Sequence, residues 1–171
     1  MRNKREFSKG LFYHVIIQTN YSTPIFANRL DRKIMLITLQ DAKDKFHFHL
    51  GNFCIMPTHI HLLIRPEEGV SLHEIMRWLK INSTERWNCI HGSTDDLWDN
   101  RYFARPLKGF SEYFPVFGYI NHNAVKAGLV RYPREWRSSG AYYIVNKISG
   151  LVDHLPFKRR GDIKFLPPPE R

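Results

Sequence analysis

Apolar and polar residues alternate along this chain with two periods, and the shorter period predicts strands. Segments rich in β-branched and aromatic residues are typical of strands, and successive side chains of a strand point to opposite faces. Four such segments are expected, at residues 11–18, 46–56, 59–65 and 97–107. The Gly51-Asn52 pair predicts a turn or bulge within the second of them.

Apolar residues three or four positions apart predict helices at residues 28–45, 71–90 and 111–128. Ser71 and Glu74 form a capping box for the second helix, and Ser111 is expected to cap the third. Gly128 is a typical residue to end that helix. Beyond Trp136 the sequence predicts mostly loop.

The predicted order β-α-β-β-α-β-α is that of an α+β, ferredoxin-like split βαβ fold with an extra C-terminal helix. We expect an antiparallel sheet of four or five strands with helices on one face. The 171 residues are enough for one domain with its own core. Residues 11–145 would form that core and residues 146–171 a basic, proline-containing tail.

The charge balance favours a polyanionic partner. Lys and Arg number 26 against 16 Asp and Glu, a net charge of +10, which suits nucleic acid or an acidic membrane surface. Cys54 and Cys89 are too few and too far apart for a disulfide framework or a zinc site. No signal peptide or membrane span is evident, so we expect a cytoplasmic protein that does not enter membranes.

The strongest candidate chemistry is the His59-Ile60-His61 triplet at the start of the third strand. Strand alternation places both imidazoles on one face and Ile60 on the other, where a core would take it. Two such imidazoles can hold a divalent metal. His47-Phe48-His49 has the same spacing, but for that pair we favour partial burial or a basic contact.

Tyr119 and Asn123 stand four positions apart on the third predicted helix, and so on one helical face. An amide oxygen there could complete a His, His, Asn set for Mg²⁺ or Mn²⁺. On this spacing alone, a core tyrosine beside a helix-surface asparagine is the favoured interpretation.

Two segments resemble the signatures of IS200-like single-tyrosine (Y1) HUH transposases, and most closely those of the REP-associated tyrosine transposases. They are Met56–Leu63 (MPTHIHLL) and Tyr119–Val130 (YINHNAVKAGLV). Shorter similarities occur in order over residues 11–145, at residues 13–15, 76–79, 102–107, 136–139 and 142. Where the family usually has His and Pro, this chain has Asn121 and Ala124.

The resemblance implies that His59 and His61 are metal ligands, Asn123 the third protein ligand and Tyr119 the nucleophile. The implied reaction is metal-assisted cutting and joining of single-stranded DNA near hairpin or REP-like sequences, through a 5′-phosphotyrosine intermediate. Relatives act as monomers or as homodimers.

Other residues are supporting candidates. His14, on the strand expected beside the third strand, would orient a metal histidine or be a buried hydrogen-bonded residue. For Asn121 and His122, helix-surface solvation competes with DNA contact. Trp78 and Trp98 fit a core better than base stacking. The basic candidates for DNA contact are Arg101, Arg105, Lys108, Lys126, Lys158, Arg159 and Arg160.

Three alternatives remain open on the sequence. One is a domesticated protein that binds DNA hairpins without cutting them. Another is a relaxase or replication initiator, although this chain has no room for an added helicase. The third is an RNA-binding ferredoxin-like module, which would carry aromatic residues on the sheet face where His59 and His61 stand.

Overall fold

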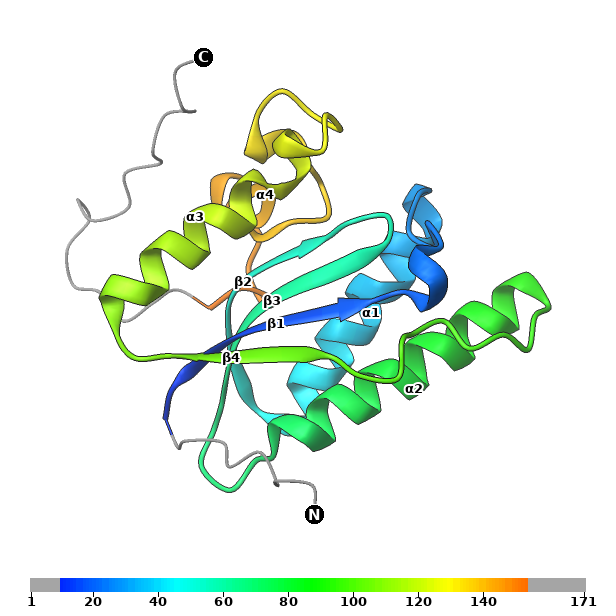
Figure 1. Cartoon of the computed structure of the whole chain (residues 1–171), viewed down its shortest axis with the longest axis horizontal. Coiled ribbons are helices and arrows are strands. Elements are labelled where there is room, and N and C mark those ends of the chain that lie inside the picture. Colours follow the sequence, from blue (N-terminus) through cyan, green and yellow to red (C-terminus); the bar gives the residue numbers. More distant parts are fainter. Residues whose placement is uncertain (1–9, 154–171) are drawn as a thin grey trace.

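A four-stranded antiparallel sheet forms the centre of the computed structural model, which describes residues 10–153 (Figure 1). The strand order is β2-β3-β1-β4. The strands are β1 (Phe12–Gln18), β2 (Phe48–Ile55), β3 (His59–Pro66) and β4 (Phe103–Leu107).

Helices cover the two faces of the sheet unequally. α1 (Arg29–Phe46) and α2 (Leu72–His91) lie side by side on one face (Figure 1). α3 (Phe110–Lys126) packs on the other face, mainly over β2. The short turns η1 (Asn20–Ser22) and η2 (Pro133–Glu135) and the helix α4 (Gly140–Val145) complete the chain. The α+β, ferredoxin-like prediction is confirmed, with α3 as the additional helix.

Strand alternation separates two apolar clusters. On β3, Ile60, Leu62 and Ile64 belong to the large core under α1 and α2, whereas Leu63 belongs to a smaller cluster under α3. His59 and His61 share the face of Leu63. The strand therefore gives its even-numbered side chains to the core and its odd-numbered ones to the α3 face.

The helix ends follow local sequence. Asn28 caps α1 by accepting a hydrogen bond from the Asp31 amide, and the Ser71 hydroxyl accepts one from the Glu74 amide. α3 ends where predicted, with Gly128 at a positive φ of 70°. The cap predicted at Ser111 is wrong: Gly109 precedes the first residue of α3, and its carbonyl accepts from the Tyr113 amide at 3.0 Å.

Three strand and loop predictions need correction. β2 starts at Phe48, because His47 follows the last residue of α1 in a left-handed conformation. His47 and His49 therefore do not lie on the same strand. The fourth strand is only residues 103–107, since Trp98 makes one isolated bridge to Thr19. The segment after Trp136 contains the short helix α4. The bulge expected near Gly51 is confirmed by a register shift between Leu50 and Asn52.

Both edges of the sheet are protected. Along β2, the Ile55 amide donates to the Ser138 carbonyl at 2.9 Å, and Leu50 exchanges hydrogen bonds with Asp153. On the opposite edge, β4 contains Pro106, which has no amide hydrogen to offer. Among the described residues, no helix is both long and apolar enough to cross a membrane.

Candidate active site

Three histidines meet on the α3 face of the sheet. β1 pairs with β3 so that Ile16 lies opposite His61 and His14 lies opposite Leu63. The His14 and His61 rings are stacked, and His14 Nε2 lies 3.0 Å from His61 Nδ1. The His59 and His61 rings are nearly perpendicular, with centroids 4.9 Å apart. His14 thus takes the place beside the third strand that the sequence predicted.

The ring nitrogens of the two β3 histidines are used in parallel ways. His59 Nδ1 lies 3.0 Å from the Thr58 hydroxyl, and His61 Nδ1 faces His14. Each ring is therefore oriented through Nδ1. His61 Nε2 is buried and has no hydrogen-bond partner. The role of Thr58 was missed from the sequence, where its position next to His59 was the available signal.

Burial keeps all three imidazoles neutral. It lowers the pKa of His61 to about 3, with the nearby charges of His59 and His14 acting in the same direction. Burial, with a smaller effect from Arg105, lowers the pKa of His14 to about 4. The pKa of His59 is lowered by burial as well. Neutral imidazole is the form that binds a metal.

α3 brings Tyr119 onto this cluster. The centroid of its ring lies 5.5 Å from that of His61 and 6.0 Å from that of His14, both edge to face. Tyr119 is 42% exposed, so part of the residue is open to solvent although it contacts the histidines. Lys126 Nζ lies 4.8 Å from the ring centroid, a cation–π distance.

Asn123 lies one turn after Tyr119 and is buried. Its amide nitrogen donates to the Tyr119 carbonyl at 3.0 Å, which fixes the amide group on its helix. With the nitrogen engaged in this way, Oδ1 is the atom that could serve as a ligand.

One observation in particular indicates that His59, His61 and Asn123 could bind a divalent metal. The buried Nε2 atom of His61 lacks a hydrogen-bond partner, as a metal ligand without its ion would. Two imidazoles and an amide oxygen suit Mn²⁺ or Mg²⁺. In the described part of the chain, no group of three or more His, Cys, Asp or Glu residues could hold an ion, so a site here would need a donor of another kind, such as the amide of Asn123.

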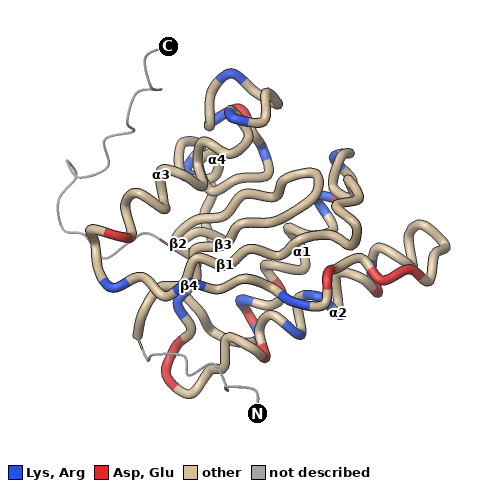
Figure 2. Tube along the Cα trace, in the orientation of Figure 1, with Lys and Arg blue, Asp and Glu red and all other residues tan. Residues whose placement is uncertain are grey.

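Basic residues lie along β4 and the turn that leads into α3 (Figure 2). Arg105 is opposite His14 in the register and lies 3.7 Å from Glu112. Arg101 and Lys108 are exposed, as is Lys126 on α3. Lys158, Arg159 and Arg160 fall outside the described residues.

Asn121 does not lie on the helix surface, and that expectation is wrong. Its side chain is 5% exposed, and its Oδ1 accepts a hydrogen bond from Asn52 Nδ2 at 2.8 Å. Asn52 also donates to the Phe117 carbonyl. Asn121 therefore fixes α3 to β2 and leaves no surface for DNA. His122 is half-buried, with Nδ1 2.8 Å from the Gly118 carbonyl.

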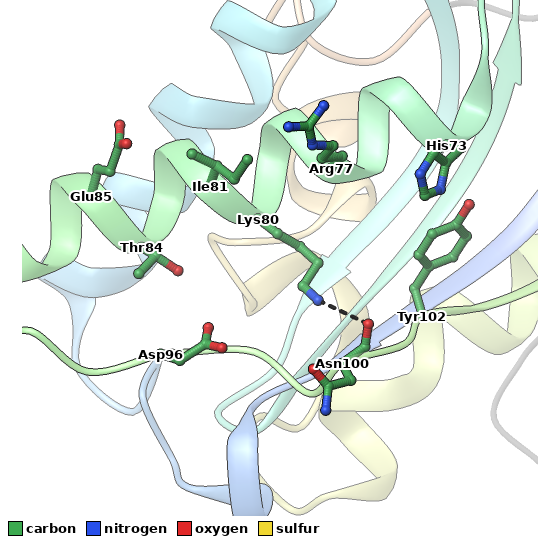
Figure 3. A pocket seen from close by; sticks show the side chains of 9 residues that line it. All are labelled: His73, Arg77, Lys80, Ile81, Thr84, Glu85, Asp96, Asn100 and Tyr102. Carbon is green, nitrogen blue, oxygen red and sulfur yellow. Dashed lines mark hydrogen bonds between the residues drawn. The ribbon is translucent and has the colours of Figure 1, made fainter.

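A separate cavity of about 470 Å³ lies between α2 and residues 96–102 (Figure 3). Lys80 crosses it to donate to the Asp99 and Asn100 carbonyls. None of the candidate site residues lines it. Trp98 is buried, and Trp78 is packed against the core, as the sequence predicted.

Comparison with known proteins identifies the family of this chain. The family model described as "Transposase IS200 like" matches residues 7–123, a range that contains His59, His61, Tyr119 and Asn123. The chain belongs to the IS200-like transposase family. No relative was found among the curated proteins.

Two solved structures are similar in fold. One is a REP-associated tyrosine transposase bound to a REP hairpin, with a TM-score of 0.72 and 19% identity, covering 90% of this chain and 88% of that one. The other is a candidate transposase from Deinococcus radiodurans, with a TM-score of 0.51 and 20% identity, covering 71% of this chain and 97% of that one.

Proposed function

We propose that this protein cuts and rejoins single-stranded DNA by transesterification, with Tyr119 as the nucleophile. The observation that carries the proposal is the contact of the exposed Tyr119 ring with His61, whose buried Nε2 lacks a partner. A tyrosine of the core would be buried, whereas Tyr119 is 42% exposed beside an imidazole nitrogen that has no hydrogen-bond partner. The assignment of HUH chemistry follows from these residues together with family membership.

His59, His61 and Asn123 would hold Mg²⁺ or Mn²⁺. The chemistry that such an ion supplies is stabilisation of charge on the scissile phosphate. Thr58 and His14 orient the two imidazoles through their Nδ1 atoms. Burial keeps the imidazoles deprotonated at neutral pH, so ligation requires no proton release from them.

In the proposed step, Tyr119 Oη loses its proton and bonds to phosphorus, and the bond from phosphorus to the 3′ oxygen breaks. The leaving oxygen takes up a proton. The products are a 5′-phosphotyrosine link and a free 3′-hydroxyl. One phosphodiester replaces another, so a 3′-hydroxyl can attack the link and join strands without an external energy source.

Arg101, Arg105, Lys108 and Lys126 are proposed phosphate contacts, and His122 stays a candidate at the same helix. The prediction for Lys158, Arg159 and Arg160 is retained from their sequence alone. The similar structure of a transposase bound to a REP hairpin supports a hairpin as the DNA partner. Because Tyr119 reaches the histidines of its own chain, a monomer would suffice. Action on DNA fits a cytoplasmic protein.

The test is cleavage of end-labelled single-stranded hairpins, taken from DNA flanking the gene, with Mg²⁺, Mn²⁺ or EDTA. Wild type is compared with Tyr119→Phe, which removes only the hydroxyl. We expect a covalent protein–DNA adduct from wild type with metal and from no other combination. Tight binding of the hairpin with no adduct would instead identify a binder that does not cut.

A further inference from the structure

β4 presents two neighbouring exposed side chains on the α3 face of the sheet, Phe103 and Arg105. Ala104 packs against the core under α1 and α2, and Leu107 belongs to the cluster under α3. Alternation therefore places Phe103 and Arg105 on the α3 face with Leu107. Phe103 is 52% exposed, although it is a large apolar residue within a strand.

The register places Phe103 in line with the metal histidines. Ile16 of β1 is paired with Phe103 on one side and with His61 on the other. Phe103 and His61 are therefore two strand spacings apart, about 10 Å across the sheet. A nucleotide bound next to the cleaved phosphate would come within reach of the Phe103 ring.

Arg105 supplies a cation next to this ring, two residues further along β4 and opposite His14. It is paired with His14 in the register, and its charge contributes to the lowered pKa of His14. Its contact with Glu112 is 3.7 Å long and about half exposed, which makes it a weak ion pair. The guanidinium can therefore exchange Glu112 for a phosphate at little cost.

We propose that Phe103 is a stacking platform for one unpaired base of the DNA strand, whose neighbouring phosphate is held by Arg105. This inference rests on the proposed function. Every base has a π-face, so an exposed ring beside a cation suits a single strand better than a duplex, whose bases are already stacked. Single exposed apolar residues are common on protein surfaces. Phe103 differs from them because the strand register aligns it with Ile16 and His61 across the sheet.

The experiment uses full-length protein in the Tyr119→Phe background, so that binding is measured without cleavage. Hairpins carry the fluorescent base 2-aminopurine at one unpaired position at a time, on either side of the cleavage site. We expect strong quenching by stacking at one position. Phe103→Ala and Phe103→Leu should abolish this quenching and weaken binding by about 5- to 100-fold, whereas Phe103→Trp should keep both.

Ile37→Ala is the matched control, because Ile37 is an apolar side chain of similar exposure, 47%, on α1 at the opposite face. It should change neither readout. Phe103→Leu keeps an apolar side chain on β4, and circular dichroism checks that each variant is folded, so that a loss of quenching can be assigned to the missing ring.

The proposal would be overturned if the Phe103→Leu variant bound the hairpin with the affinity of the parent protein and quenched 2-aminopurine to the same extent. So would equal binding of an RNA strand of the same sequence, or a change in oligomeric state caused by Phe103→Ala, since these point to RNA or a second copy of the chain as the occupant. Adduct formation by protein with Tyr119 intact is scored separately. If no adduct forms but the quenching still depends on Phe103, the proposed DNA cleavage is rejected and the proposed stacking on Phe103 stands.

Discussion

The two faces of the sheet are built from the same strands, and they differ in what covers them. The face under α1 and α2 is a closed apolar core that includes Val15, Ile17, Ile60 and Leu62, all fully buried. The other face is closed by α3 over β2 and lies open towards β4, where Phe103 is half exposed. One face holds the fold together, and the other carries the three histidines and Tyr119 of the proposed site.

The sharpest way to test this division is to change adjacent residues of β3 that point to opposite faces. His61→Ala should lower hairpin cleavage by on the order of 100-fold or more, because charge on the phosphate would lose its stabilisation. Circular dichroism checks that the variant is folded under the assay conditions, because its truncation also removes the partner of the buried His14. Initial rates of adduct formation with Mn²⁺ provide the measurement, and near-wild-type rates would rule out His61 as a ligand.

Ile60→Ala should have the reverse effect. The side chain is fully buried in the core, so its truncation leaves a cavity and should cost about 2–5 kcal/mol of unfolding free energy. Urea denaturation followed by circular dichroism measures this loss. Hairpin cleavage at 10 °C should persist while the variant is folded. A loss below 1 kcal/mol would contradict the assignment of this face as the core.

Asn52→Ala tests how α3 is held on the face of the sheet that carries the histidines. It removes the hydrogen bonds to Asn121 and to the Phe117 carbonyl and leaves the buried Asn121 oxygen without a partner. We expect a loss of about 1–3 kcal/mol in unfolding free energy. Asn146→Ala, at an exposed helix end, is the control and should be near neutral. Equal stability of both variants would mean that apolar packing alone places α3.

The smallest expected effect is a pH dependence of stability carried by His14. Its pKa is about 4 in the fold against 6.5 when free, so the unfolded chain binds the proton first. The stabilising contribution is complete above pH 6.5 and is lost as the pH falls towards 4, by about 1–2 kcal/mol at pH 5. The urea midpoint is measured in EDTA between pH 7 and pH 5, and we expect it to fall less with decreasing pH in His14→Gln than in wild type. The same fall in both proteins would contradict a contribution from His14.

The sequence predicted the elements whose pattern is local. The alternation in β3 identified the face of Ile60 and the face of His61, and the cap at Ser71 follows from Glu74 three residues later. It extended the fourth strand to Leu97 because Leu97 and Trp98 are apolar, although they are buried outside any strand. The six residues of α4 are too few to show a helical period.

Contacts between segments that are distant in the sequence could not be predicted from local sequence patterns. Asn121 looked like a surface residue because its burial depends on Asn52, a partner in a strand 69 positions away. The approach of Tyr119 to His61 likewise spans two elements, and spacing alone favoured a core tyrosine. Resemblance to a family suggested that these residues belong together, and the packing of α3 shows how they meet.

The protected edges of the sheet have a consequence for association between molecules. An unpaired edge strand is a template on which another chain can add a strand. Repeated additions of this kind lead to aggregation. Here Ser138 and Asp153 occupy the backbone groups of β2, and Pro106 interrupts those of β4. A chain that gathers on a long polyanion at high local concentration is thereby protected against continuous β-pairing with its neighbours.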